Sequence, residues 1–324
     1  MINIIFCSPS SLLATNIKQT FKSKNIEIDE INAQITRFKD GEISVNIKNN
    51  VRGKIVFVVH SANHNPNDDI MEFLVVVDAL KRSSAKEIIG VIPYFYYARQ
   101  DRISEPRSPI TAKLYANLLE SAGVNKIMTM DLHVGQIQGF FNIPVDNLYF
   151  WPSVVNDINT KFVNMDKNDI VVTSPDVGGI VRARSLAKKI NTQIVIIDKR
   201  REKPGLSEVM NIIGDVFGKN CIIFDDIIDS GGTLCGAADA MKQKGAKYVG
   251  SYITHGIFSE NAFEKIHNSA MDFCCVSDTI NNKSIIERLD NSKIKCISSS
   301  EIFVNAIFQS VMSGGSVSKF FDIN

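Results

Sequence analysis

Short runs rich in β-branched residues alternate along this chain with segments of helical composition. The runs predicted to be buried strands are Ile55–His60, Ile88–Pro93, Lys126–Asp131, Ile170–Ser174, Gln193–Asp198, Cys221–Asp226 and Tyr248–His255. The predicted helices between them are Asp68–Ser83, Thr111–Ala122, Val181–Ile190 and Leu234–Lys244. This alternation predicts the α/β class, with parallel sheets flanked by helices. Because ligands bind such sheets at the carboxyl ends of the strands, we expect functional residues directly after these runs.

Two parts of the chain repeat three dipeptides in the same order, which indicates two related domains. The repeated dipeptides are Gly53-Lys54, Asp78-Ala79 and Ala85-Lys86 in the first part, and Gly218-Lys219, Asp239-Ala240 and Ala246-Lys247 in the second. The length of 324 residues also corresponds to about two typical domains. We therefore predict one domain over 1–148 and a second over 149–306, with the tail from about 307 to 324 packing back on the first.

The charged residues of the chain are almost balanced. Lysine and arginine number 36 and aspartate and glutamate 35, which leaves a formal net charge of +1. This balance predicts binding neither to nucleic acid nor to a membrane surface through bulk charge. The longest apolar stretches, such as Ile55–Val59, are far shorter than the ~20 residues of a membrane span. The six cysteines include no C-x-x-C pair, so we expect reduced thiols in a cytoplasmic protein.

Residues 221–233 are the most informative part of the sequence for function. An apolar strand leads into Asp225 and Asp226, then into a turn with Asp229, Ser230 and two glycines, and then into a helix. Backbone amides, hydroxyls and a helix N-terminus suit a phosphate, whereas carboxylates suit neutral hydroxyl groups. A phosphorylated sugar with a vicinal diol presents both. The alternative, a helix N-terminus with acidic capping residues, explains less of the pattern.

Polar side chains also follow several other predicted strands. From the residues alone, Arg99-Gln100-Asp101 suits a nucleotide as well as it suits a solvated loop. The cations Lys199-Arg200-Arg201 suit an anionic ligand, or they form a solvated charge run. A lone His133 is more typical of a core or surface residue, whereas Asp176 offers the oxygen donors that Mg²⁺ prefers. Asp40-Gly41 is a common hairpin signal.

These motifs together resemble one family along most of the chain. Residues 225–233 resemble the phosphoribosyl-diphosphate loop of type I phosphoribosyltransferase folds. The chain as a whole resembles the class I ribose-phosphate pyrophosphokinases, also called phosphoribosyl-diphosphate synthetases. The segments that carry this resemblance are 37–42, 97–102, 109–113, 131–133, 136–141, 174–179, 198–201 and 225–233. The resemblance implies an N-terminal ATP-binding and oligomerisation domain and a C-terminal domain that binds ribose 5-phosphate.

The resemblance also implies a reaction and the residues that perform it. Such enzymes transfer the β,γ-diphosphate of ATP to the C1 hydroxyl of ribose 5-phosphate, giving AMP and 5-phosphoribosyl 1-diphosphate. By resemblance, Lys199 and Arg201 are the catalytic pair, on a loop through Pro204-Gly205 that closes over ATP and excludes water. His133 and Asp176 lie around the catalytic Mg²⁺.

The remaining implied contacts concern substrates, effectors and other subunits. The expected ribose 5-phosphate residues are Arg201, Asp225, Asp226, Asp229, Ser230, Gly231, Gly232 and Thr233. The expected ATP residues are Phe38, Asp40, Gly41, Glu42, Arg99, Gln100 and Asp101, with Phe38 stacking on an adenine bound by a neighbouring subunit. An ATP site shared in this way needs at least a dimer, and the family implies a homohexamer. Arg52 and Ser316-Val317-Ser318 resemble contacts to inorganic phosphate or ADP as effectors.

Other functions explain less of the sequence. A phosphoribosyltransferase accounts for residues 225–233 but leaves the nucleotide segments and Lys199-Arg200-Arg201 without a purpose. A catalytically silent subunit typically carries an insertion in the lid, and none is visible between 199 and 210. A sugar-sensing transcription factor needs a basic DNA-reading module. The chain departs from the family pattern in two loops, because 103–108 is less basic and 202–206 includes Glu202.

Overall fold

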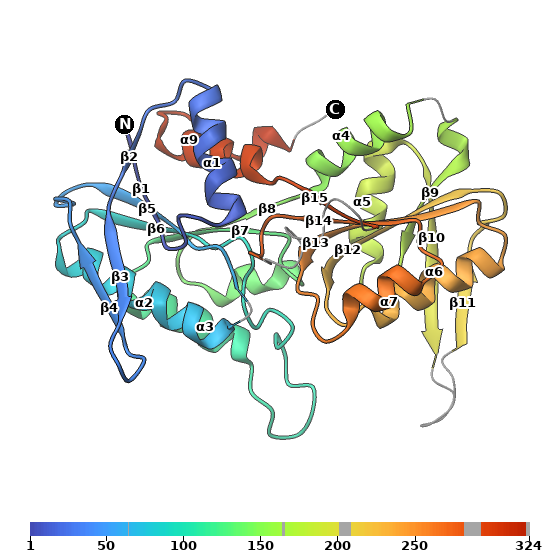
Figure 1. Ribbon diagram of the computed structural model, residues 1–324, viewed down its shortest axis with the longest axis horizontal. Coiled ribbons are helices and arrows are strands. Elements are labelled where there is room, and N and C mark those ends of the chain that lie inside the picture. The colour runs from blue at the N-terminus through green and yellow to red at the C-terminus, as the bar shows by residue number, and fades with distance from the viewer. Residues whose placement is uncertain (64, 164–165, 201–208, 282–292, 322–324) are drawn as a thin grey trace. The chain divides into compact units, whose positions relative to one another are not determined.

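The structure is a computed structural model that describes residues 1–324 except 64, 164–165, 201–208, 282–292 and 322–324 (Figure 1). The chain forms two compact units. The first contains Met1–Tyr149, Thr279–Asn281 and Ser298–Asn324, and the second contains Phe150–Asp278 and Asn282–Ile297. Helix α9 (Ser300–Val311) belongs entirely to the first unit, whereas the sequence prediction began the return to this unit at about residue 307.

The first unit is built on a six-stranded sheet in the order β2-β1-β5-β6-β7-β8. All neighbouring strands of this sheet are parallel. The strands are β1 (Ile2–Phe6), β2 (Ile28–Glu30), β5 (Ile55–Val59), β6 (Glu87–Val91), β7 (Lys126–Met130) and β8 (Val145–Leu148). Antiparallel strands β3 (Ala33–Arg37) and β4 (Ile43–Ile47) form a separate hairpin.

Helices cover both faces of the first sheet. Figure 1 shows α1 (Leu12–Ser23) and α9 on one face, and α2 (Pro66–Arg82) and α3 (Thr111–Ala122) on the other. Short 3₁₀ helices η1 (Gly135–Phe140) and η3 (Ser318–Phe320) complete the unit. Helix α1 begins after Ser11, whose hydroxyl accepts the Ala14 N–H at 3.2 Å, a typical N-cap.

The second unit is built on a seven-stranded sheet in the order β11-β10-β9-β12-β13-β14-β15. Its strands are β9 (Ile170–Ser174), β10 (Gln193–Arg200), β11 (Val209–Ile213), β12 (Asn220–Ile228), β13 (Tyr248–Gly256), β14 (Phe273–Ser277) and β15 (Ile294–Ile297). The edge strand β11 is antiparallel to β10, and the other pairs are parallel. The central strands are apolar on both faces, as expected for a sheet covered by helices on two sides.

Helices α4 (Trp151–Lys161) and α5 (Ile180–Ile190) lie on one face of the second sheet, and α6 (Gly232–Gln243) and α7 (Ala262–Asn268) on the other (Figure 1). A 3₁₀ helix, η2 (Lys167–Asp169), precedes β9. The α/β class predicted from the sequence is therefore confirmed. All six cysteines are free thiols, and within the described part of the chain no helix has the length and hydrophobicity needed to cross a membrane.

Candidate active site

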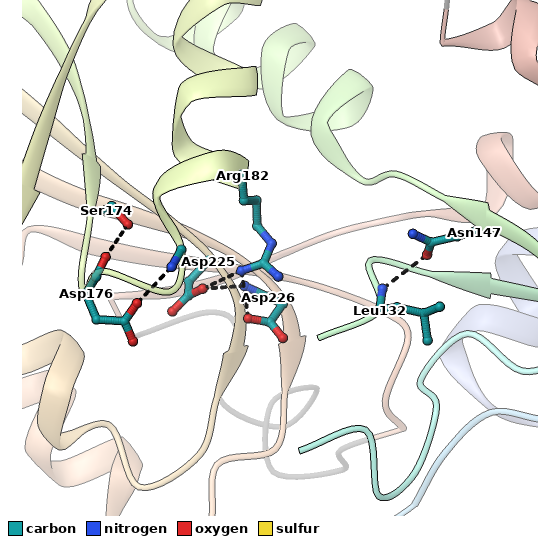
Figure 2. A network of polar contacts seen from close by, with 8 residues as sticks. Leu132, Asn147, Ser174, Asp176, Arg182, Asp225 and Asp226 are labelled. Atoms are coloured by element: carbon teal, nitrogen blue, oxygen red, sulfur yellow. Dashed lines mark hydrogen bonds and ion pairs between the residues drawn. The ribbon is translucent and has the colours of Figure 1, made fainter. Parts of the chain in front are cut away.

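Two carboxylates of β12 share one guanidinium from α5 (Figure 2). Arg182 Nη1 lies 2.7 Å from Asp225 Oδ1 and 2.8 Å from Asp226 Oδ1. The Asp226 side chain is only 5% exposed, whereas that of Asp225 is 19% exposed. Charge-assisted hydrogen bonds of this length are among the stronger polar contacts in proteins. The predicted sugar-binding acids are thus brought together, and Asp225 is the more accessible of the two.

The environment of Asp225 disfavours its ionised form. Burial and the neighbouring charge of Asp226 raise the pKa of Asp225 to about 8, although Arg182 acts in the opposite direction. The backbone N–H of Asp226 also donates to Asp225 Oδ1 at 2.9 Å. A carboxyl group with such a pKa changes its protonation state near neutral pH, which is typical of residues at functional sites.

The loop between β9 and α5 brings a third acid to the same edge of the sheet. Asp176 is exposed, and its Oδ1 accepts the Gly179 N–H at 2.9 Å at the start of α5. Ser174 Oγ donates to the Asp176 carbonyl at 2.7 Å. A Cβ at Gly179 would lie 2.9 Å from Ser174 Oγ and 3.5 Å from Asp225 Oδ1, so the close approach of α5 depends on this glycine.

The turn between β12 and α6 has the features of an anion site. Asp229 and Ser230 are half-buried, and Gly231 adopts a left-handed conformation with φ +76° as the N-cap of α6. Gly231 has no side chain to accept the first N–H groups of the helix, and Gly232 is exposed. The free N–H groups of a helix N-terminus attract anions. Together with the Thr233 hydroxyl, this turn suits a phosphate beside the carboxylates.

Strand β10 brings one predicted catalytic residue to this edge of the sheet. The sheet order β11-β10-β9-β12 places the carboxyl ends of β10, β9 and β12 side by side. Lys199 lies near the end of β10, where it pairs with Met210 of β11. Arg201 and the predicted lid 202–207 fall outside the described residues.

The β3–β4 turn of the first unit presents an aromatic ring to the outside. Phe38 is 60% exposed, although the turn that carries it is well fixed. Its N–H donates to the Glu42 carbonyl at 2.8 Å, and the Gly41 N–H donates to the Phe38 carbonyl at 3.0 Å. Gly41 has φ +96°, and Asp40 Oδ1 accepts the Glu42 N–H at 3.1 Å. A large ring exposed on an ordered turn is a natural stacking surface.

The other predicted residues of the first unit follow β6 and β7. Arg99 and Gln100 are exposed and Asp101 is half-buried, in the loop after β6. Thr111 Oγ1 donates to Gln100 Oε1 at 2.5 Å, which fixes this loop to the start of α3. His133 is half-buried after β7, next to Leu132, whose N–H donates to Asn147 Oδ1 at 3.1 Å. His133 therefore belongs to the first unit and Asp176 to the second.

Sequence reasoning missed Arg182. It lies in the first turn of α5, where the positive end of the helix dipole disfavours a cation. That unfavourable position was a signal in the sequence, because residues 181–190 were already predicted as a helix. The partners of Arg182 were not visible, since they are 43 and 44 residues away along the chain.

Known proteins match the chain over nearly its whole length. Residues 2–123 match a family described as the N-terminal domain of ribose phosphate pyrophosphokinase. Residues 166–322 match a family described as the phosphoribosyl synthetase-associated domain.

Relatives and a solved structure agree with these matches. Ribose-phosphate pyrophosphokinase of Brucella melitensis is 51% identical over 290 residues, which covers 90% of this chain and 92% of the relative. The protein of the same name from Bradyrhizobium diazoefficiens is 52% identical, with 90% of each chain covered. A crystal structure of phosphoribosylpyrophosphate synthetase from Mycobacterium smegmatis has a TM-score of 0.85 and 33% identity, covering 96% of this chain and 99% of that one. The resemblance is thereby confirmed, and the chain belongs to the ribose-phosphate pyrophosphokinase family.

Proposed function

We propose that this enzyme transfers the β,γ-diphosphate of ATP to the C1 hydroxyl of ribose 5-phosphate, giving AMP and 5-phosphoribosyl 1-diphosphate. Relatives about half identical to the chain carry the name of this activity. The observation that carries the proposal is that two acids near the end of β12 are followed by a turn suited to an anion. Asp225 and Asp226 lie near the end of β12, and the Gly231–Gly232 turn begins five residues after Asp226, so this connection suits one ligand that presents both hydroxyls and a phosphate.

Ribose 5-phosphate binds along the β12–α6 connection in this proposal. Its phosphate accepts hydrogen bonds from the backbone of Gly231, Gly232 and Thr233 and from the Ser230 hydroxyl. Asp225 accepts hydrogen bonds from the sugar hydroxyls, and Asp229 lies beside them. Arg201 supplies an additional cation for the bound anions. The sugar is thereby oriented with its C1 hydroxyl directed at the nucleotide.

ATP binds through the residues of the first unit. Arg99, Gln100 and Asp101 contact the nucleotide, and the exposed Phe38 ring stacks on the adenine with Asp40, Gly41 and Glu42 around it. In this proposal the turn carrying Phe38 completes a site on a neighbouring subunit. The protein is therefore a homo-oligomer, a hexamer by analogy with the class.

The chemical step forms one bond to phosphorus and breaks another. The C1 oxygen loses its proton and bonds to the β-phosphorus, and the bond from that phosphorus to the oxygen carried by AMP breaks. Lys199 and Arg201 stabilise the negative charge that spreads over the transferred group and AMP. In this proposal the segment that begins at Arg201, directly after β10, closes over ATP and excludes water, which otherwise competes with the sugar hydroxyl.

We further propose Mg²⁺ as cofactor, held by His133 and Asp176 together with substrate phosphates. Among the described residues, no three His, Cys, Asp or Glu side chains are grouped to hold a metal ion. Mg²⁺ does not need such a group, because it commonly binds through one or two carboxylates, waters and phosphates. The exposed Asp176 carboxylate fits this requirement. Bound Mg²⁺ would neutralise charge on the diphosphate oxygens.

Inorganic phosphate and ADP are proposed as effectors, bound by Arg52 and the segment 316–318. Arg52 Nη1 donates to Ser84 Oγ at 3.0 Å, so its guanidinium is held on the surface of the first unit. The hydroxyls of Ser316 and Ser318 lie 3.0 Å apart. Cations and paired hydroxyls are typical phosphate ligands. We also propose a cytoplasmic location, because all six cysteines are free thiols, as is typical of proteins in a reducing compartment.

Incubation with ATP, Mg²⁺ and ribose 5-phosphate, followed by mass spectrometry, tests the proposed reaction. We expect AMP and 5-phosphoribosyl 1-diphosphate in equal amounts. Formation of ADP would indicate transfer of a single phosphate and would overturn the proposal. Absence of any product would favour a silent subunit, and consumption of 5-phosphoribosyl 1-diphosphate with a free base would favour a phosphoribosyltransferase.

A further inference from the structure

The two acids of β12 that contact Arg182 differ in their exposure to solvent. A single nitrogen, Nη1, contacts Oδ1 of both Asp225 and Asp226 (Figure 2). Asp226 is almost fully buried, whereas Asp225 keeps about four times the exposed fraction, at 19% against 5%. The guanidinium is thus anchored on Asp226 and braces the carboxylate that a ligand can reach.

The surroundings of Arg182 indicate that it does more than stabilise the fold. A cation in the first turn of a helix opposes the helix dipole, which costs free energy. The helix itself is brought close by Gly179, where a side chain would crowd Ser174 and Asp225. Arg182 Nη1 contacts two acids at once, Asp225 at 2.7 Å and Asp226 at 2.8 Å, which is more than a single structural ion pair requires.

We infer that Arg182 is a positioning residue for sugar recognition: anchored on Asp226, it holds the Asp225 carboxylate in the orientation that accepts hydrogen bonds from vicinal hydroxyls. This inference rests on the proposed function of Asp225. The contacts from Arg182 and from the Asp226 N–H both use Asp225 Oδ1, so they fix the plane of the carboxylate. Oδ2 is the oxygen assigned to the diol. Arg182 therefore sets the preference for a 2-hydroxyl sugar without touching it.

Steady-state kinetics of Arg182→Gln and Arg182→Lys test this role, with Arg184→Gln as the matched control on an exposed position of the same helix. Ribose 5-phosphate and 2-deoxyribose 5-phosphate are compared as substrates. R182Q should lower kcat/KM for ribose 5-phosphate by about ten- to a hundredfold, the scale of a lost charged hydrogen bond. KM for ATP should not change. The preference for ribose over 2-deoxyribose 5-phosphate should fall, since the deoxy substrate never used the lost contact.

R182K retains the charge but reaches about one bond less far, so its efficiency and sugar preference should lie between those of R182Q and the unmodified protein. A folded R182Q with unchanged sugar preference would overturn the inference. If R182Q does not fold, R182K with unchanged efficiency and preference would do so. Asp225→Asn tests the proposed sugar site itself, separately from the role of Arg182. If this variant binds ribose 5-phosphate as tightly as the unmodified protein, the proposed sugar site is wrong.

Discussion

The backbone N–H of Gly179 donates to Oδ1 of Asp176 at 2.9 Å, which joins the proposed metal ligand to the start of α5. Two substitutions separate the proposed role of Asp176 as a metal ligand from its hydrogen bond to the start of α5. Asp176→Asn retains an acceptor for the N–H but loses the charge, so it should reduce activity at a given Mg²⁺ concentration while leaving the melting temperature unchanged. Asp176→Ala should also cost about 1 kcal/mol of stability, as for a lost helix cap. Mg²⁺ titrations and thermal unfolding check both, and full activity of D176N at low Mg²⁺ would contradict the metal role.

Ribose 5-phosphate affinity should rise as the pH is raised from about 7 to about 9. The pKa of Asp225 is raised to about 8, first by burial and then by Asp226, so a larger fraction is ionised and able to accept hydrogen bonds at the higher pH. The phosphate of the sugar stays doubly charged throughout, because its second pKa is about 6. Isothermal titration calorimetry measures the change. Asp225→Asn should bind more weakly and show no such pH dependence; an equal slope in both proteins would assign the titration to another group.

Lys199→Ala should lower kcat by about 10²–10³-fold, the cost of removing one group that stabilises charge in a transition state. Ribose 5-phosphate affinity should be nearly unchanged, because Lys199 acts on the transferred group. Rapid-quench kinetics and calorimetry separate the two quantities. Lys188→Ala, at an exposed position of α5, is the control for loss of a cation. Unchanged turnover in K199A would remove Lys199 from the mechanism.

Phe38→Ala should raise KM for ATP by about 5- to 160-fold, since stacking of a base on an aromatic ring contributes about 1–3 kcal/mol. KM for ribose 5-phosphate and the melting temperature should not change, because Phe38 is 60% exposed. The control is Phe217→Ala, which removes an even more exposed ring in the second unit, 77% exposed. If F38A and F217A have the same KM for ATP, the stacking role is wrong.

The free energy of unfolding should fall as the pH drops below about 6.5, because the buried His60 resists protonation in the folded state. His60 is buried, its Nε2 has no hydrogen-bond partner within the described structure, and burial lowers its pKa. Because its folded-state pKa lies below the unfolded value, the unfolded chain takes up the proton first and is stabilised by it. Melting temperatures at about pH 7 and about pH 5.5 measure the effect. His60→Gln should show a smaller decrease, and an identical decrease would exclude His60 as the cause.

Local sequence signals predicted much of the fold and part of the site. The run Ile170–Ser174 and the segment Thr111–Ala122 have the same bounds as β9 and α3. Their side chains contain the needed information, because β-branched residues favour strands and a 3.6-residue apolar period favours helices. The adjacency of Asp225 and Asp226 to a Gly-containing turn is likewise a local pattern. This local pattern is the basis of the predicted sugar-phosphate site.

Long-range pairing limited what the sequence could predict. The antiparallel edge strand β11 was not expected, because its direction depends on pairing with β10 rather than on its own composition. In the same way, Arg182 is an ordinary residue of a predicted helix until its contacts with β12 are known.

Residue order along the chain was enough to identify the α/β class and the family and to predict a ligand for residues 225–233, since these inferences depend on neighbours in sequence. The sharing of one guanidinium by Asp225 and Asp226, and the unequal exposure of the two acids, came from the packing of α5 against the sheet. Hydrogen-bond geometry and burial depend on groups more than 40 residues apart, which no local pattern encodes.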